Sequence, residues 1–166
     1  MGSILGLPRF DTAEFEARFP FGKVSLTDKE MPVRVTVLGW SPFIPGDPDN
    51  SSLPVGGLEY VLENTSTKPQ EMIFSYHARN FLSWGKGVDA IKVMPHGFVL
   101  SQAGTEAEPH LQGDFAIFTD EDSPKINYCW FRGGWFDSLT MVWNAIESGL
   151  MPQSPAVEKG APGASI

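Results

Sequence analysis

The chain is poor in the residues that build disulfide frameworks and metal sites. Its 166 residues include one cysteine, Cys129, and three histidines. A single thiol excludes an internal disulfide, and His77, His96 and His110 lack the spacing of a metal site. The Gly-x-Ser-x-Gly motif of many serine hydrolases is absent. We therefore expect no metal and no cofactor, and we assign no catalytic residue.

Basic residues and long apolar runs are scarce as well. Twelve Lys and Arg against 20 Asp and Glu give a formal net charge of −8. An acidic chain without a local basic patch is repelled by nucleic acid and by anionic membranes. No segment approaches the roughly 20 apolar residues that span a bilayer, and residues 1–10 lack the pattern of a secretory signal. With its single thiol, the chain is expected to be cytoplasmic and without a transmembrane segment.

Strand and turn patterns dominate what is present. Apolar and polar residues alternate with a period of two, which is typical of half-buried strands. The strands are predicted at residues 14–19, 23–27, 32–39, 58–63, 71–78, 97–102, 114–119 and 127–132. The links are short and rich in proline and glycine, so they cannot hold the crossovers that a parallel sheet requires. We predict an all-β fold, a two-sheet antiparallel β-sandwich with one short helix near the C-terminal end.

The helix is predicted to begin after Asp137 or Ser138, because either side chain can cap the first turn. Four apolar residues recur at helical spacing and form one face: Leu139, Val142, Trp143 and Ile146. Gly149 can end the helix in a left-handed conformation. The prolines at 152 and 155 then prevent its continuation.

We predict a single domain over residues 1–166. Residues 1–12 are expected to form a leader or a first strand, and residues 150–166, rich in proline, glycine and alanine, a loop. That loop has the composition of a connection into a further strand. We therefore expect the domain to be incomplete at its C-terminal end, with one sheet edge left unpaired.

The first candidate site is a loop over residues 40–54, which carries apolar residues where polar ones are usual. Four prolines stiffen it. A stiff loop that presents Trp40 and Phe43 is suited to docking against another surface. The alternative is that these side chains fold back over the end of the sandwich. Asp47 could ligate Ca²⁺, but the downstream Gly and Glu of a calcium loop are missing.

The second candidate site is the aromatic run over residues 128–137. The indole of Trp135 could stack on a sugar ring, and Arg132 and Asp137 could bind its hydroxyls. The alternative is a core strand followed by a tight Gly-Gly turn, with Asp137 as a helix cap. Contact with a following domain is a third interpretation.

Residues 41–47 and 51–55 resemble a segment of the non-lysosomal glucosylceramidase, or bile-acid β-glucosidase, family, which is glycoside hydrolase family 116. The similarity extends from about residue 17 to residue 166. It includes residues 18–21, 74–81, 102–105, 113–116 and 130–137. The last of these segments is most similar to the bacterial members.

The resemblance implies an N-terminal β-sandwich that precedes a large α/α-barrel catalytic domain. Related enzymes hydrolyse β-glucosides, including glucosylceramide, with retention of configuration. Their nucleophile Glu and acid/base Asp lie in the barrel, and no position of this chain matches either. We expect an accessory domain of a glycoside hydrolase that packs on the catalytic domain of the same protein and is inactive alone. The alternatives are a free-standing carbohydrate-binding module that binds a glucoside and a structural sandwich without a ligand.

Overall fold

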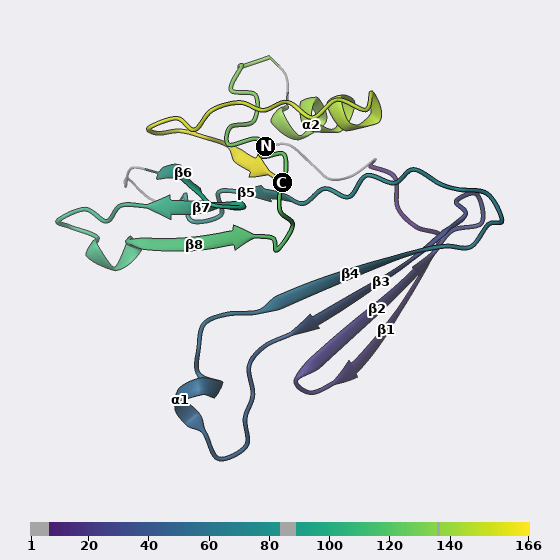
Figure 1. The fold of residues 1–166 in the computed structure, drawn as a ribbon. Coiled ribbons are helices and arrows are strands. Elements are labelled where there is room, and N and C mark those ends of the chain that lie inside the picture. The colour runs from purple at the N-terminus through teal and green to yellow at the C-terminus, as the bar shows by residue number, and fades with distance from the viewer. Residues whose placement is uncertain (1–6, 84–88, 136) are drawn as a thin grey trace. The chain divides into compact units, whose positions relative to one another are not determined.

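Most of the chain consists of antiparallel strands and the turns that join them. A computed structural model describes residues 7–83, 89–135 and 137–166. The prediction of an all-β fold with one short helix near the C-terminal end is confirmed (Figure 1). The strands lie in two compact units, which we call the sheet unit, residues 7–72, and the core unit, residues 73–166.

The sheet unit is a four-stranded antiparallel meander. It contains β1 (Thr12–Arg18), β2 (Phe21–Thr27), β3 (Val33–Trp40) and β4 (Gly57–Asn64), which are neighbours in chain order. The short helix α1 (Pro48–Ser51) lies in the connection between β3 and β4. The register places Phe15, Val24, Val37 and Tyr60 in one cross-strand row.

One face of this meander is apolar along its whole length, because residues that pair across neighbouring strands share a face. The apolar face contains Ala13, Phe15, Ala17, Val24, Leu26, Val33, Val35, Val37, Leu58, Tyr60 and Leu62. The opposite face carries the ion pairs Lys23–Glu16 and Arg34–Glu63. Residues 7–72 contain no second layer over the apolar face, since α1 is their only other element.

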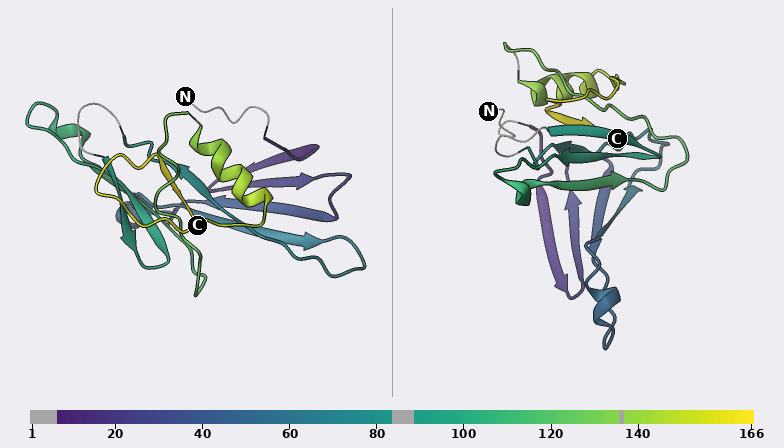
Figure 2. Two further views of the ribbon diagram at one scale, coloured as in Figure 1. Left: turned by 90° about the horizontal axis from the view of Figure 1, so that it is seen from above. Right: turned by 90° about the vertical axis from the view of Figure 1, so that its left-hand side faces the viewer.

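The core unit contains two antiparallel sheets. Strands β6 (Asp89–Met94), β7 (Gly97–Gln102) and β8 (Gly113–Phe118) form one, and β5 (His77–Arg79) and β9 (Gly163–Ser165) form the other. A single turn of 3₁₀ helix, Pro109–Leu111, precedes β8. Helix α2 (Ser138–Glu147) lies beyond the β5–β9 sheet, on the side away from the three-stranded sheet (Figure 1 and Figure 2).

The hydrophobic core lies inside the core unit. Its members come from both sheets and from the segments beside them: Ala78, Ile91, Phe98, Leu100, Cys129, Ala161 and Ala164. Ile91, Leu100 and Phe98 share one face of the three-stranded sheet, because alternate residues of a strand point the same way. Phe98 and Leu100 are fully buried, and the strand predicted at residues 97–102 is present as β7.

Strand β9 lies between two other segments of the core unit. On one side, Tyr76 and Ile166 exchange backbone hydrogen bonds of 2.7 and 3.0 Å. On the other side, Asn127 and Ser165 exchange two of 2.9 Å, and the Trp130 N–H donates to the Gly163 carbonyl at 3.0 Å. Both edges of β9 are thus paired, which makes it a central strand although it has only three residues.

Besides shifts of one or two residues at strand ends, four segments differ from the sequence-based expectation. Of residues 71–78, only the end joins a strand, and residues 127–132 form an isolated bridge at Asn127 instead of a ladder. Strands β6 and β9 were not predicted. Gly, Ala and Ser, which make up β9, have low strand propensity, so nothing in their sequence distinguishes this strand from a loop.

Helix α2 agrees with its prediction at both ends. The Asp137 carboxylate accepts hydrogen bonds from the Leu139 N–H and the Thr140 hydroxyl, each at 3.2 Å. These bonds satisfy donors that the first turn leaves without a backbone partner. Gly149 has φ of +69°, the left-handed conformation that ends many helices.

A buried polar network joins β5, β9 and Trp130. The Ser165 hydroxyl lies 2.7 Å from His77 Nδ1 and accepts a hydrogen bond of 2.8 Å from the Trp130 indole N–H. His77 Nε2 lies 2.9 Å from the Ser75 hydroxyl. Burial lowers the pKa of the His77 imidazole below its usual value of 6.5, because desolvation disfavours the charged form.

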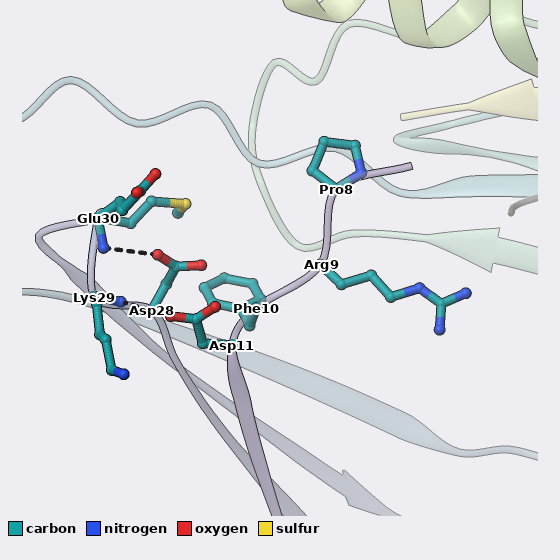
Figure 3. Close-up of a pocket in the computed structure, with 8 residues that line it drawn as sticks. Pro8, Arg9, Phe10, Asp11, Asp28, Lys29 and Glu30 are labelled. Atoms are coloured by element: carbon teal, nitrogen blue, oxygen red, sulfur yellow. Dashed lines mark hydrogen bonds between the residues drawn. The ribbon is translucent and has the colours of Figure 1, made fainter. Parts of the chain in front are cut away.

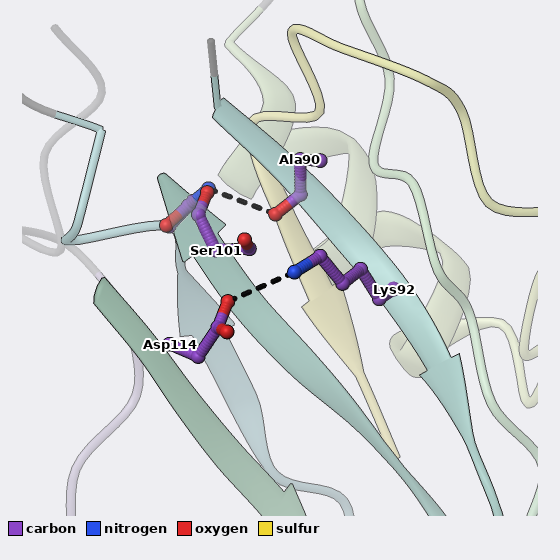
Figure 4. A network of polar contacts seen from close by, with 5 residues as sticks. Ala90, Lys92, Ser101 and Asp114 are labelled. Atoms are coloured by element: carbon purple, nitrogen blue, oxygen red, sulfur yellow. Dashed lines mark hydrogen bonds and ion pairs between the residues drawn. The ribbon is translucent and has the colours of Figure 1, made fainter. Parts of the chain in front are cut away.

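A second polar network connects the three-stranded sheet to the end of β5 (Figure 4). The Asn80 amide donates to the carbonyls of Ala90 and Ser101, both at 3.2 Å. Lys92 and Asp114 form an ion pair of 3.0 Å on the same sheet. A hydrogen bond from the Ser101 side chain and the pairing with Lys92 lower the pKa of the Asp114 carboxyl.

Replacing Gly163 with alanine is expected to destabilise the core unit by about 1–3 kcal/mol, the usual cost of overpacking. An added Cβ would lie 2.6 Å from the Ala78 carbonyl oxygen and 2.7 Å from the Trp130 ring, so strand pairing and core packing must both shift. Gly113→Ala is the matched control, because an added Cβ there meets nothing within 4 Å. Urea unfolding followed by tryptophan fluorescence measures both. Equal stability of the two variants would contradict the central position of β9.

The free energy of unfolding is expected to decrease as the pH falls below about 6.5. In that range the unfolded chain binds a proton at His77, whereas the folded chain keeps this imidazole neutral. Above the unfolded pKa this contribution to stability is fully present. The pKa values of Asp47 and Asp114 are lowered, so these carboxylates stay ionised across the window. Thermal unfolding at pH 7.5 and 5.5 tests this, and His77→Gln should show a smaller decrease than the unmodified chain.

Candidate functional site

Exposed apolar side chains gather at one end of the sheet unit. They come from the β1–β2 turn, the adjoining strand ends and the β3–β4 connection, and we call them the aromatic surface. It consists of Phe19, Phe21, Trp40, Phe43, Ile44, Leu53 and Val55, of which Trp40 is 45% exposed and Phe19 76%. The pairing of Phe21 with Trp40 brings the β1–β2 turn and the β3–β4 connection to the same end of the sheet.

Two contacts give the aromatic surface a defined shape. The rings of Phe19 and Phe43 meet edge to face with centroids 4.7 Å apart, an arrangement that aromatic quadrupoles favour. The Trp40 indole lies against the backbone of Gly57, where an added Cβ would collide with the ring. The two aromatic groups are therefore held by neighbours within the sheet unit while one side of each stays in solvent.

Asp47 serves to order the β3–β4 connection. Its carboxylate caps α1 by accepting the Asn50 N–H at 3.0 Å, and it also accepts the Asn50 side-chain amide. The bond from the Asn50 side chain is the main cause that lowers the pKa of the Asp47 carboxyl. Ser51 braces the same loop, since its hydroxyl accepts the Ile44 N–H at 2.9 Å and donates to the Ile44 carbonyl at 3.1 Å.

The chemistry of the aromatic surface suits contact with another protein surface. It presents aromatic and aliphatic groups on a backbone stiffened by proline and by the Asp47 cap. Contiguous exposed apolar groups of this kind mark interaction sites on soluble proteins.

Among the residues that the structure describes, no group of three or more His, Cys, Asp or Glu side chains could hold a metal ion.

The candidates of the second site are Arg132, Trp135 and Asp137. All three lie in the core unit, and each has a different environment. The Arg132 guanidinium donates to the Lys159 carbonyl at 3.1 Å. Trp135 is 96% exposed. Asp137 caps α2, as one of the alternative interpretations expected, while the neighbouring Cys129 and Trp130 are buried.

Asp137 also lines a polar pocket of about 370 Å³ in the core unit, whereas Arg132 and Trp135 do not. The pocket lies where the end of β5, the start of β6, the start of α2 and residues 160–162 meet. Its other ionisable residues are Arg79 and Asp89. These two residues were not singled out from the sequence, because they are far apart along the chain and neither belongs to a motif.

A second pocket, of about 560 Å³, lies at the opposite end of the sheet unit (Figure 3). It is lined by residues 8–11 and 28–31. Asp28 accepts the Glu30 N–H at 2.8 Å, and Asp11 accepts the Lys29 N–H at 3.3 Å. Both carboxylates thus help to shape the β2–β3 turn, and Arg9 points away from them in Figure 3.

The nucleophilic side chains of the core unit have structural roles. Ser165 and His77 approach as closely as a nucleophile and its base do, but Ser165 is fully buried and its hydroxyl also accepts from Trp130. Burial raises the pKa of the Cys129 thiol, against a smaller lowering by the charge of Arg132. Cys129 is a free thiol in the buried interior. No helix of the described segments is long and apolar enough to cross a membrane.

The sequence indicated the loop over residues 40–54, which supplies Trp40, Phe43, Ile44 and Leu53, but missed the rest of the aromatic surface. Phe19 and Phe21 flank a proline in the β1–β2 turn, and large aromatic residues in a hairpin turn are a signal that could have been used. Leu53 and Val55 lie on the returning half of the β3–β4 connection. The path of this half of the loop is not defined by the sequence.

Comparison with known proteins gives one family. No curated protein matches this sequence. The family described as β-glucosidase 2, glycosyl-hydrolase family 116 N-terminal, matches residues 5–166. Because the match covers nearly the whole chain, the resemblance found in the loop over residues 41–55 extends to both units. The chain belongs to the N-terminal domain family of the family 116 glycosyl hydrolases.

Proposed function

We propose that this chain is the accessory N-terminal domain of a β-glucosidase-type glycoside hydrolase and that it docks on the catalytic domain of the same protein through the aromatic surface. Membership of an N-terminal domain family supports the first part. The observation that carries the second is the cluster of exposed Trp40, Phe43 and Phe19, in which the connection that bears Phe43 is ordered by Asp47. In this role the chain supplies no catalytic residue and supports the domain that does.

The energetics favour docking within one polypeptide. Full burial of a large apolar side chain contributes about 1.5–3 kcal/mol, and less where the side chain is already half covered. Association of two separate molecules costs about 4–15 kcal/mol in lost motion. A covalent linker removes much of this cost by raising the effective concentration to the millimolar range. A surface of seven apolar side chains is therefore sufficient for a linked domain and gives only weak binding between separate ones.

The rigidity of the β3–β4 connection contributes to the same result. Ordering a flexible loop on binding costs free energy, whereas the Asp47 cap and the Ser51 hydrogen bonds have already ordered this one. The Phe19–Phe43 contact likewise holds two rings in place before a partner arrives. The aromatic surface thus loses little conformational freedom when it is covered.

Replacing both Trp40 and Phe43 with alanine is expected to weaken binding of the chain to the separately expressed catalytic domain at least tenfold. The reason is the loss of the two largest side chains on the loop, and aromatic anchors dominate such interfaces. Titration calorimetry measures the affinity. Phe118→Ala is the matched control, because Phe118 is a 68% exposed aromatic residue of the core unit, outside the aromatic surface.

Two outcomes would contradict this function. One is equal affinity of the double variant, the control and the unmodified chain. The other is turnover of an aryl β-glucoside by the purified chain, with a rate that scales with its concentration, because an accessory domain without catalytic groups cannot hydrolyse the substrate.

A further inference from the structure

The polar pocket of the core unit has walls that are tied to one another. The Asn80 N–H donates to the Pro162 carbonyl at 3.3 Å, and the Gly160 N–H donates to the Asp89 carbonyl at 3.3 Å. Gly160 has φ of +70°, so the turn that leads into residues 161–162 uses a conformation that other residues adopt at a cost. These bonds connect the ends of β5 and β6 to the segment before β9.

The floor of the pocket is part of the buried core. Asn80 is 7% exposed, and its side chain makes three hydrogen bonds, to the Ala90 and Ser101 carbonyls and from the Leu82 N–H. Ala161, also in the lining, belongs to the hydrophobic core. Asn80 and Ala161 are therefore held in place before a ligand binds, a property shared by the lining of most small-molecule sites.

The lining limits the chemistry of a ligand. Among the described residues of the lining, Asp89 and Asp137 outnumber Arg79, which disfavours an anion such as phosphate. Serine and asparagine side chains and the backbone of residues 160–162 make up much of the remaining wall, so an apolar ligand would leave polar groups without partners. Two carboxylates without a third acidic, histidine or cysteine ligand among the described residues fall short of a metal site. An uncharged molecule with several hydroxyl groups is compatible with all three limits.

The two carboxylates retain capacity to accept hydrogen bonds. The Asp137 oxygens each accept one, from the Leu139 N–H and from the Thr140 hydroxyl, and a carboxylate offers about four acceptor sites. Within the described segments, no residue donates to the Asp89 carboxylate, which belongs to the same lining. Hydrogen bonds from hydroxyls to charged acceptors are stronger than those between neutral groups.

We propose that this pocket is a binding site for a monosaccharide-sized sugar, with the Asp89 and Asp137 carboxylates accepting hydrogen bonds from its hydroxyls. The volume of about 370 Å³ lies at the lower end of the range for small-molecule pockets and fits a single sugar ring better than an oligosaccharide. This site lies within the core unit alone. The proposal therefore does not depend on docking through the aromatic surface, and either can fail without the other.

The test is a titration of the ¹⁵N-labelled chain with D-glucose, methyl β-D-glucopyranoside and inorganic phosphate, each up to about 100 mM. We expect saturable shifts of backbone amide signals around Asp89, Ser138 and Gly160 for the sugars, with dissociation constants on the order of millimolar, as for a small ligand held by a few hydrogen bonds. Asp89→Asn and Asp137→Asn should each weaken sugar binding at least tenfold, because both replace a charged acceptor with a neutral one. Asparagine also caps helices well, so Asp137→Asn preserves α2.

Asp122→Asn is the matched control, since it makes the same chemical change on an exposed residue outside the pocket, and its affinity should equal that of the unmodified chain. Three outcomes would overturn the proposal. The first is the absence of saturable shifts with either sugar, and the second is shifts that map outside the pocket. The third is phosphate binding tighter than sugar binding, which would identify the pocket as an anion site.

Discussion

The pairing of β9 on both of its edges is the constraint on which the core unit depends. Three small residues bring together segments that are distant in sequence, since Ser165 binds His77 and Trp130 through one hydroxyl group. Small side chains are required at this place, because Gly163 leaves room for the Trp130 ring and the Ala78 carbonyl. The hydrophobic core, the position of Asn80 and the walls of the polar pocket all rest on this arrangement.

The sheet unit has a different basis for its structure. Its strands are neighbours in sequence, so local turns and cross-strand pairs define the register. The ion pairs on its polar face are exposed and contribute little. Its apolar face and the aromatic surface are both more exposed than the interior of the core unit. A stable meander with so little buried side-chain area is suited to presenting surface to a partner.

The sequence allowed reliable prediction where local rules decide the structure. Periodicity located β3, β7 and β8 closely, and capping chemistry located α2 through Asp137 and Gly149. Prediction failed where contacts between segments distant in sequence determine the structure. Nothing local marks Gly163–Ser165 as a strand, and nothing local relates Arg79 to Asp89. The aromatic surface was half predicted, because Trp40 and Phe43 share a loop whereas Phe19 approaches only through the sheet.

The location of β9 near residue 165 has a consequence for synthesis on the ribosome. The sheet unit can form its hairpins as soon as residues 7–72 have emerged, since its contacts are local. Residues 76–79 and 127–130, by contrast, cannot form their strand pairing until β9 has been translated. Ser165 of β9 follows His77 by 88 residues. Until then the core around Phe98 and Leu100 lacks Ala161 and Ala164 and is incompletely covered. The nascent core unit is therefore the stage at which a chaperone has most to bind.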